Sequence, residues 1–294
     1  MAKIHETALV SPEAVLGNDI EIGPFSIIDE CVRIGDRTII GPHVQVDRWT
    51  TIGEDCQVFF GSTIGNPSKD LKYKKGDRSY VTIGDRNVLR EYVSVSRPTV
   101  AEESTIIGDD NLLMNWVNIA HDSVVGDRTI MANFATLGGH VTVEDDVRVG
   151  AHAALHPFIR VGKMAMVGAC SKFVQDVPPF TVADGHPAVV RGLNIVGIRA
   201  SKINPLSALS SDTISQLKKA YRLLFRSNMA LTKAIEKVRS ELDPNEEVQY
   251  LLNFIEKSQR GVGVQKKNIL QDVDLEDDVV TKNRNILLFC QLEE

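Results

Sequence analysis

Histidine is the side chain best suited to move protons near neutral pH, and three histidines in this sequence follow one another at similar intervals. The interval from His121 to His140 and that from His140 to His156 are both close to one turn of the repeat described below. We therefore expect these three side chains to form a column along one edge of the fold. Such a column could hold a metal ion, could combine a catalytic base with substrate-binding partners, or could be three exposed histidines without chemistry. His152 does not fit the spacing and is not expected in the column.

The neighbours of these histidines favour proton transfer at an acyl group. His121 is followed by Asp122, and a carboxylate beside a histidine can hold one tautomer and make the ring a better base. Gly139 precedes His140, and a glycine lets a backbone N–H approach a ligand closely, as an oxyanion donor must. A base and an oxyanion donor about one turn apart suit acyl transfer. The sequence contains no Ser/His/Asp motif and no cysteine in a basic setting, which favours direct transfer over a covalent enzyme intermediate.

A six-residue repeat in the sequence predicts the structural elements that must position these residues. Apolar residues recur at every sixth position from Ile4 to Ile64 and again from Ile107 to Phe173, and glycine often follows them. A period of six fits neither an α-helix nor a simple alternating strand. It fits a triangular coil of three short strands and three tight corners, with about 18 residues per coil and coils ~4.8 Å apart. We therefore expect a left-handed parallel β-helix of hexapeptide repeats over residues 1–190.

Two interruptions of the repeat predict loops at residues 65–82 and 97–106. Loops that leave a rigid scaffold commonly carry binding residues, although a tolerated surface insertion is the alternative. The first loop is rich in lysine, which suits either contact with a pyrophosphate or plain exposure to solvent.

The repeat stops near residue 190, and helical spacing of apolar residues follows. We expect an α-helical C-terminal domain over residues 191–261, with one helix after Ser211-Asp212, one over residues 229–242, and one after Asp243 with Pro244 in its first turn and Gly261 as its stop. Basic residues on the first of these helices could dock an acidic protein or simply be solvated. No role is assigned to residues 262–294.

Composition excludes several classes of protein. The formal net charge is -6 and no basic stripe is evident, which argues against binding to nucleic acid. The four cysteines are far apart and form neither a disulfide framework nor a zinc site. No apolar run approaches the ~20 residues needed to span a bilayer, and the N-terminus lacks the plan of a signal peptide. We expect a cytoplasmic protein without stable membrane insertion, resident metal or cofactor.

A set of motifs, in order along the chain, resembles one family. The motifs are SKDLKY, IGDRN, DNLLMN, NIAHD, ATLGGHV, VGACS, QDVPPF, GLNIVG and a closing F-x-x-S-x-RG. They are similar to those of the UDP-N-acetylglucosamine O-acyltransferases of lipid A biosynthesis, over about residues 4–261. The resemblance implies a homotrimer with active sites between subunits, an (R)-3-hydroxyacyl chain donated by acyl carrier protein, and the sugar 3-hydroxyl of UDP-N-acetylglucosamine as the acceptor.

The resemblance also implies roles for individual residues. His121 matches the general base, Asp122 the neighbour that orients it, and the backbone N–H of Gly139 the oxyanion donor. Ala169 lies where the family sets acyl-chain length. Substrate contacts are implied for Asp70, Lys72, Asn118, His140, His156 and Asn194.

The chain departs from the family's pattern around the acceptor. The replaced positions are Lys69, Ser96, Asn118, Pro157, Val196, Ala200 and Ser201. A different UDP-sugar, including an amino sugar that accepts an amide-linked chain, therefore stays open as the acceptor. Two other hypotheses remain: a metal enzyme on the same fold, resembling γ-class carbonic anhydrases, and a non-catalytic hexapeptide protein.

Overall fold

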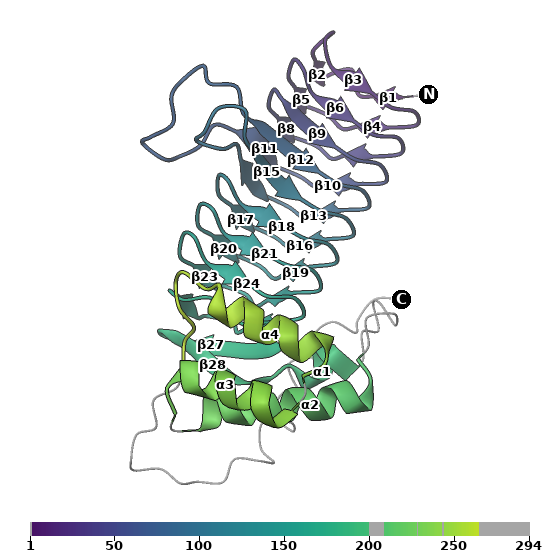
Figure 1. The fold of residues 1–294 in the computed structure, drawn as a ribbon. Coiled ribbons are helices and arrows are strands. Elements are labelled where there is room, and N and C mark those ends of the chain that lie inside the picture. The colour runs from purple at the N-terminus through teal and green to yellow at the C-terminus, as the bar shows by residue number, and fades with distance from the viewer. Residues whose placement is uncertain (1, 200–208, 228, 243, 265–294) are drawn as a thin grey trace. The chain divides into compact units, whose positions relative to one another are not determined.

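Short strands joined by tight corners wind into a left-handed parallel β-helix with three faces in the computed structural model (Figure 1). The structure describes residues 2–199, 209–227, 229–242 and 244–264. Each face is one sheet, and successive strands over residues 3–173 belong to the first, second and third sheet in turn. The expected fold class is confirmed.

The strands of the first sheet are parallel up to the last pair. They are β1 (Lys3–Ile4), β4 (Glu21–Ile22), β7 (Ile39–Ile40), β10 (Gln57–Val58), β13 (Val88–Leu89), β16 (Leu112–Leu113), β19 (Ile130–Met131), β22 (Arg148–Val149), β25 (Met166–Val167), β27 (Thr181–Gly185) and β28 (Ala188–Leu193).

The other two sheets are parallel throughout. The second sheet contains β2 (Leu9–Val10), β5 (Ile27–Ile28), β8 (Gln45–Val46), β11 (Thr63–Asn66), β14 (Ser94–Ser96), β17 (Asn118–Ile119), β20 (Thr136–Leu137), β23 (Ala154–Leu155) and β26 (Lys172–Phe173). The third sheet contains β3 (Val15–Leu16), β6 (Arg33–Ile34), β9 (Thr50–Ile52), β12 (Tyr80–Ile83), β15 (Ser104–Ile107), β18 (Val124–Val125), β21 (Thr142–Val143) and β24 (Arg160–Val161).

Each regular coil consists of three hexapeptides, as the sixfold spacing predicts. Asn118 pairs with Thr136 and Ile119 with Leu137, and the same offset holds in the first coils, where Ile4 pairs with Ile22. The second residue of most strands points inward and is buried, so the branched side chains of successive coils stack into one continuous core. β-Branched residues suit this arrangement because they fit a pleated, half-buried surface.

Three corners connect the sheets, and we name them by their order along the chain. The first corner joins the first sheet to the second, the second corner joins the second sheet to the third, and the third corner returns to the first sheet. One non-glycine residue at most corners adopts a left-handed conformation, for example φ 60° at Asp122 and 59° at His140. Positive φ is costly for most residues, so the stacked ladders must hold these positions in place.

The third corner carries a ladder of alternating charges. Arg37 is bonded to Asp55 at 2.7 Å, Arg86 to Asp110 at 2.7 Å, and Arg128 to Asp146 at 3.1 Å. Beside this ladder runs a column of aspartates whose carboxylates accept backbone N–H groups from the preceding coil, such as Asp85 N to Asp109 at 2.9 Å. The corner backbone of one coil is therefore tied to side chains of the next.

This ladder predicts acid-sensitive stability. The hydrogen bond from Arg86 lowers the pKa of Asp110, and the bond from Arg37 lowers that of Asp55. A carboxyl group whose folded pKa lies below its unfolded value of ~3.9 contributes stability that is complete above that value and is lost as the pH falls toward the folded pKa. We expect the melting temperature to drop below about pH 4, and Arg86→Gln to make the drop shallower. Melting curves of both proteins against pH would check this, and an identical slope for the variant would contradict it.

The β-helix ends in an antiparallel hairpin that the six-residue repeat did not predict. β27 pairs with β25 in parallel and with β28 in antiparallel register, from Thr181↔Leu193 to Gly185↔Ala188. The domain boundary expected at residue 190 thus falls within β28, which is paired with β27 along its length.

The helical region follows the hairpin. It contains α1 (Ile195–Arg199), α2 (Ser211–Tyr221), the π-helical turn η2 (Arg222–Arg226), α3 (Leu231–Leu242) and α4 (Glu246–Glu256). Ser210 caps α2 by accepting from Thr213 N at 3.1 Å, and Asn245 caps α4 by accepting from Val248 N at 3.0 Å. Pro244 precedes this cap rather than lying in the first turn, and α4 ends at Glu256, earlier than the expected stop at Gly261.

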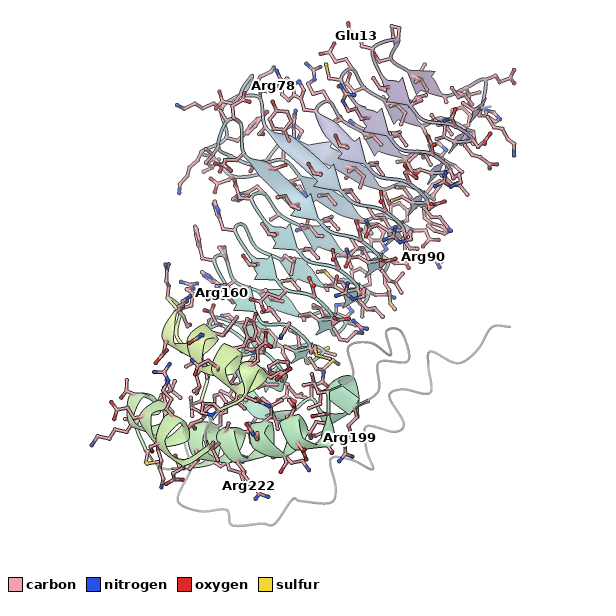
Figure 2. The ribbon with its side chains drawn as sticks, turned by 45° about the vertical axis from the view of Figure 1, so that its right-hand side comes forward. Glu13, Arg78, Arg90, Arg160, Arg199 and Arg222 are labelled. Atoms are coloured by element: carbon pink, nitrogen blue, oxygen red, sulfur yellow. The ribbon has the colours of Figure 1, made fainter. Side chains whose placement is uncertain are left out.

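The helices pack on each other and on the end of the β-helix. Their buried faces share a second apolar cluster that includes Leu217, Val238 and Leu251. Arg160 of β24 stacks over the Phe254 ring at 4.3 Å, and Figure 2 shows Arg160 beside α4. Ser258 donates to Asp176 at 2.7 Å. Within the described residues, no helix combines the length and apolarity needed to cross a membrane. Ala200, Ser201 and most of the 262–294 segment lie outside the described residues.

Candidate active site

The second corner gathers most of the residues that could do chemistry. The two predicted loops leave the β-helix here (Figure 1). We call the loop between β11 and β12 (residues 67–79) the first excursion and the loop between β14 and β15 (residues 97–103) the second excursion. The next three coils present His121, His140 and His156 at the same corner. Two long loops and three histidines therefore meet along one edge of the β-helix.

His121 is held by the carboxylate of the next residue. Its Nδ1 lies 2.6 Å from Asp122 Oδ2, and the two side chains are only 14% and 8% exposed. An ionised carboxylate can only accept, so Nδ1 carries the proton and Nε2 is left with a free lone pair. This tautomer is the one that a general base needs, because Nε2 can then take a proton from a substrate.

The same carboxylate oxygen has further donors from the second excursion. Asp122 Oδ2 accepts from Thr99 N at 3.1 Å and from Thr99 Oγ1 at 3.0 Å. The Asp122 backbone N–H donates to Thr105 Oγ1 of the preceding coil at 2.9 Å, and this bond helps to hold Asp122 in its left-handed conformation. Nothing in the sequence pattern pointed to Thr99, since it lies in an excursion 23 residues from its partner.

Asp70 comes from the first excursion and faces the other side of the His121 ring. Its Oδ2 is 3.6 Å from His121 Nε2, too far for a direct hydrogen bond, while its Oδ1 accepts from Lys72 N at 2.8 Å. The turn is completed by Ser68, whose hydroxyl accepts from Asp70 N at 3.2 Å. The Lys72 side chain is exposed. Asp70 therefore marks the side from which a polar substrate group would reach Nε2.

Gly139 stacks directly on the His121 ring, as the length of the coil predicts. A Cβ placed on Gly139 would lie 2.3 Å from His121 Cε1 and 2.6 Å from Nε2, so only glycine leaves room for the imidazole. Among the described residues, no group accepts a hydrogen bond from the Gly139 N–H. A free N–H beside the ring nitrogen is what an oxyanion donor requires.

The three histidines share the corner but do not form one column. His140 lies one coil above Asp122, with Nε2 3.6 Å from Asp122 Oδ2, and its ring stacks on Phe158 at a centroid distance of 4.5 Å. His156 comes before Phe158, so it sits at a different position of the corner, where Nδ1 contacts Arg260 Nη2. The expected column is wrong in this detail, because a shift of one or two positions changes which way a corner side chain points. His152 lies at the first corner, stacked on Phe134 at 4.7 Å.

Two of the departures from the family's pattern touch each other. Lys69 Nζ donates to Asn118 Oδ1 at 3.4 Å, across 49 residues of sequence. Ser96 is 2% exposed and pairs with Asn66 where β11 meets β14. Three of the replaced residues, Lys69, Ser96 and Asn118, therefore lie on the second sheet and the first excursion, in the coil of His121 or earlier coils.

Other predicted site residues lie elsewhere in the chain. Ala169 is exposed at the first corner, next to Gly150. Figure 2 shows how far apart these edges are, since Arg90 marks the first corner and Arg78 the excursion at the second. Asn194 is buried at the start of α1, where its side chain donates to Met164 O at 2.8 Å and accepts from Gly197 N at 3.0 Å. Val196 is 58% exposed on α1.

One cluster has the composition of a metal site. His121, Asp122 and His140 offer ligand atoms within 4.8 Å of one another. Zinc would need nitrogen ligands at ~2.0–2.1 Å, and the 2.6 Å bond between His121 and Asp122 would have to open to admit it. The hydrogen-bonded arrangement instead suits proton transfer.

Comparison with known proteins adds the family context. A sequence profile described as Udp N-acetylglucosamine O-acyltransferase, domain 2, matches residues 176–263, and a six-repeat bacterial transferase hexapeptide profile matches residues 13–48 and 104–139. An acyl-[acyl-carrier-protein]–UDP-N-acetylglucosamine O-acyltransferase from Thermodesulfovibrio yellowstonii is 46% identical over 89% of this chain and 99% of its own length.

Two further proteins show the same likeness. The enzyme of that description from Thiobacillus denitrificans is 42% identical over the same shares of the two chains. The crystal structure of a UDP-N-acetylglucosamine acyltransferase from Bacteroides fragilis superimposes with a TM-score of 0.83 at 34% identity, covering 88% of this chain and 98% of the other.

Proposed function

This chain belongs to the UDP-N-acetylglucosamine O-acyltransferase family, and from this we propose that it transfers an (R)-3-hydroxyacyl chain from acyl carrier protein to the 3-hydroxyl of UDP-N-acetylglucosamine in lipid A biosynthesis. The observation that carries the proposal is the His121 imidazole, whose Nδ1 is bonded to a buried carboxylate and whose Nε2 lies against Gly139. Base, orienting carboxylate and oxyanion donor thus meet at one point.

The reaction follows from this geometry. His121 Nε2 removes the proton from the acceptor hydroxyl as its oxygen attacks the thioester carbonyl carbon. The Gly139 N–H stabilises the negative charge on the carbonyl oxygen of the tetrahedral intermediate. The intermediate then collapses, the C–S bond breaks, and the leaving thiolate takes the proton from His121. Asp122 stabilises the imidazolium that exists between the two proton transfers.

An acyl-transfer assay tests the proposal directly. The full chain would be incubated with a panel of acyl carrier protein thioesters and several UDP-sugars, and the products identified by mass. We expect an acylated UDP-N-acetylglucosamine whose chain is released by mild base, because esters hydrolyse far faster than amides. A base-stable product from an amino sugar would support the alternative acceptor, which the replaced residues leave open.

Two other outcomes would contradict the proposal. If no UDP-sugar is acylated or bound, the chain is a non-catalytic hexapeptide protein. If the purified protein contains stoichiometric zinc at His121, Asp122 and His140, the metal enzyme is favoured.

We also propose that the active protein is a homotrimer with sites between subunits. Ala169 at the first corner and His121 at the second lie on different edges of one chain, so a chain-length residue could approach the base only if a neighbouring copy supplied it. Light scattering should then give three times the chain mass. Mixed trimers of His121→Ala and Ala169→Trp chains should recover activity, because some of their sites receive both unaltered residues. The cytoplasmic location stays a prediction.

A further inference from the structure

Thr99 of the second excursion contacts the carboxylate of Asp122, which is bonded to His121. No motif or spacing in the sequence predicted this contact. Asp122 Oδ2 lies between two histidines, 2.6 Å from His121 Nδ1 and 3.6 Å from His140 Nε2. A carboxylate in this position could pair with either ring. Something must hold it toward His121, because only that pairing leaves His121 Nε2 free to act.

Thr99 supplies the missing constraint. Its N–H and its hydroxyl both donate to Asp122 Oδ2, at 3.1 and 3.0 Å, so this one oxygen takes three hydrogen bonds with the bond from His121. Hydrogen bonds to a charged acceptor are stronger than neutral ones, and the Asp122 side chain is only 8% exposed, so water competes little for it. Two donors from one residue fix both the position of the oxygen and the direction of its lone pairs.

The residues before Thr99 are themselves anchored. Arg97 is 4% exposed, its N–H donates to Asn66 O at 2.9 Å, and its guanidinium lies over the Trp49 ring at 5.0 Å. The carbonyl of Pro98 accepts from the fully buried Ser79 hydroxyl at 3.1 Å, and Ser79 belongs to the end of the first excursion. The two residues before Thr99 are therefore held by contacts with Asn66, Trp49 and Ser79.

We propose that Thr99 is a positioning residue for the general base: through Asp122 it holds His121 in the tautomer and orientation that acyl transfer requires. This inference rests on the function proposed above. The second excursion then has a role in the reaction, since residues 97–103 bring the N–H and the hydroxyl of Thr99 to the Asp122 carboxylate.

The test removes the hydroxyl and keeps the shape. Thr99→Val should lower kcat about tenfold while KM for the UDP-sugar changes less than about twofold, because Thr99 bonds Asp122 on the Nδ1 side of His121 and not on the Nε2 side proposed to meet the acceptor. Thr99→Ser keeps the donor and should restore most of the rate. Thr51→Val alters an exposed strand threonine two coils nearer the N-terminus than Thr99 and is the matched control, with unchanged kcat expected.

A double-mutant cycle separates this role from a structural one. If Thr99 acts through Asp122, Thr99→Val should cause no further loss in an Asp122→Asn background. An equal loss in both backgrounds, a Thr99→Val rate within about twofold of the unaltered chain, or a Thr99→Ser variant as slow as Thr99→Val would each overturn the proposal. Thr99→Ala replaces Thr99→Val in the cycle if the latter melts at a lower temperature.

A readout that needs no turnover keeps this inference distinct from the proposed function. The low-field proton resonance of His121 Nδ1–H, assigned by its loss in His121→Ala, should move upfield or broaden in Thr99→Val and persist in Thr99→Ser. An unaltered resonance in Thr99→Val would overturn the proposal. Absence of acylated sugar from the unaltered chain would instead overturn the function alone.

Discussion

His121→Ala should lower kcat by about 10²–10⁴-fold while the protein stays folded. The substitution removes Nε2, the nitrogen that we propose takes the proton from the acceptor hydroxyl, and it leaves the Gly139 N–H in place. The inward-facing neighbour Ile119 forms the core at this coil, whereas the His121 side chain faces the corner, so little apolar packing is lost. Single-turnover rates with acyl carrier protein thioester and UDP-N-acetylglucosamine would measure the effect on the chemical step.

His5→Ala is the matched control for this experiment. His5 is exposed in the first coil, far along the chain from the second-corner cluster, and its ring bonds only to Thr7 at 3.0 Å among the described contacts. Its removal should leave kcat unchanged. A His121→Ala rate equal to that of the His5→Ala protein would refute the base assignment.

Gly139→Ala should be nearly as damaging, for a steric reason. The added methyl would lie 2.3 Å from His121 Cε1 and 2.6 Å from Nε2, distances that real Cβ contacts do not show, so the imidazole must move. A displacement of about 1 Å at a catalytic group can cost ~10²-fold in rate. The Gly139 backbone is not in the left-handed region, so alanine itself is tolerated there and the melting temperature should change little.

Two comparisons make the Gly139 experiment specific. Gly192→Ala adds a methyl in β28 where nothing lies within 4 Å, and it should leave the rate unchanged. In a His121→Ala background the methyl at Gly139 meets no ring, so Gly139→Ala should then cost little more. A full additional loss in that background would show that the glycine acts independently of the base.

The strongest parts of the site could be read from local spacing. A repeat of six makes each coil three hexapeptides long, and this alone places Gly139 over His121 and His140 over Asp122. The same count shows why the predicted histidine column was inexact. Three hexapeptide steps from His140 lead to Phe158, whose ring stacks on it, and His156 reaches the corner before that position. Within a coil, one position decides which way a side chain points.

The sequence predicts where the two excursions begin and end, but it does not predict their conformation. Their ends are visible as breaks in the repeat, near Asn66 and Tyr80 and near Ser96 and Ser104. The return of Thr99 to the corner depends on contacts between segments that are distant in sequence, such as Ser79 with Pro98 and Thr99 with Asp122. Such contacts leave no periodic signal because each occurs once.

The sequence by itself determined the β-helix, its core and the adjacency of His121 and Asp122, since a stacked coil needs only local, repeated information. The tertiary structure alone decided that Thr99 of the second excursion bonds the Asp122 carboxylate and that Asp70 of the first excursion faces the His121 ring. The physical reason is that the repeat period and the residue propensities determine structure only within one coil and between neighbouring coils. The orientation of a catalytic side chain is instead set by single hydrogen bonds between segments that come together only after folding.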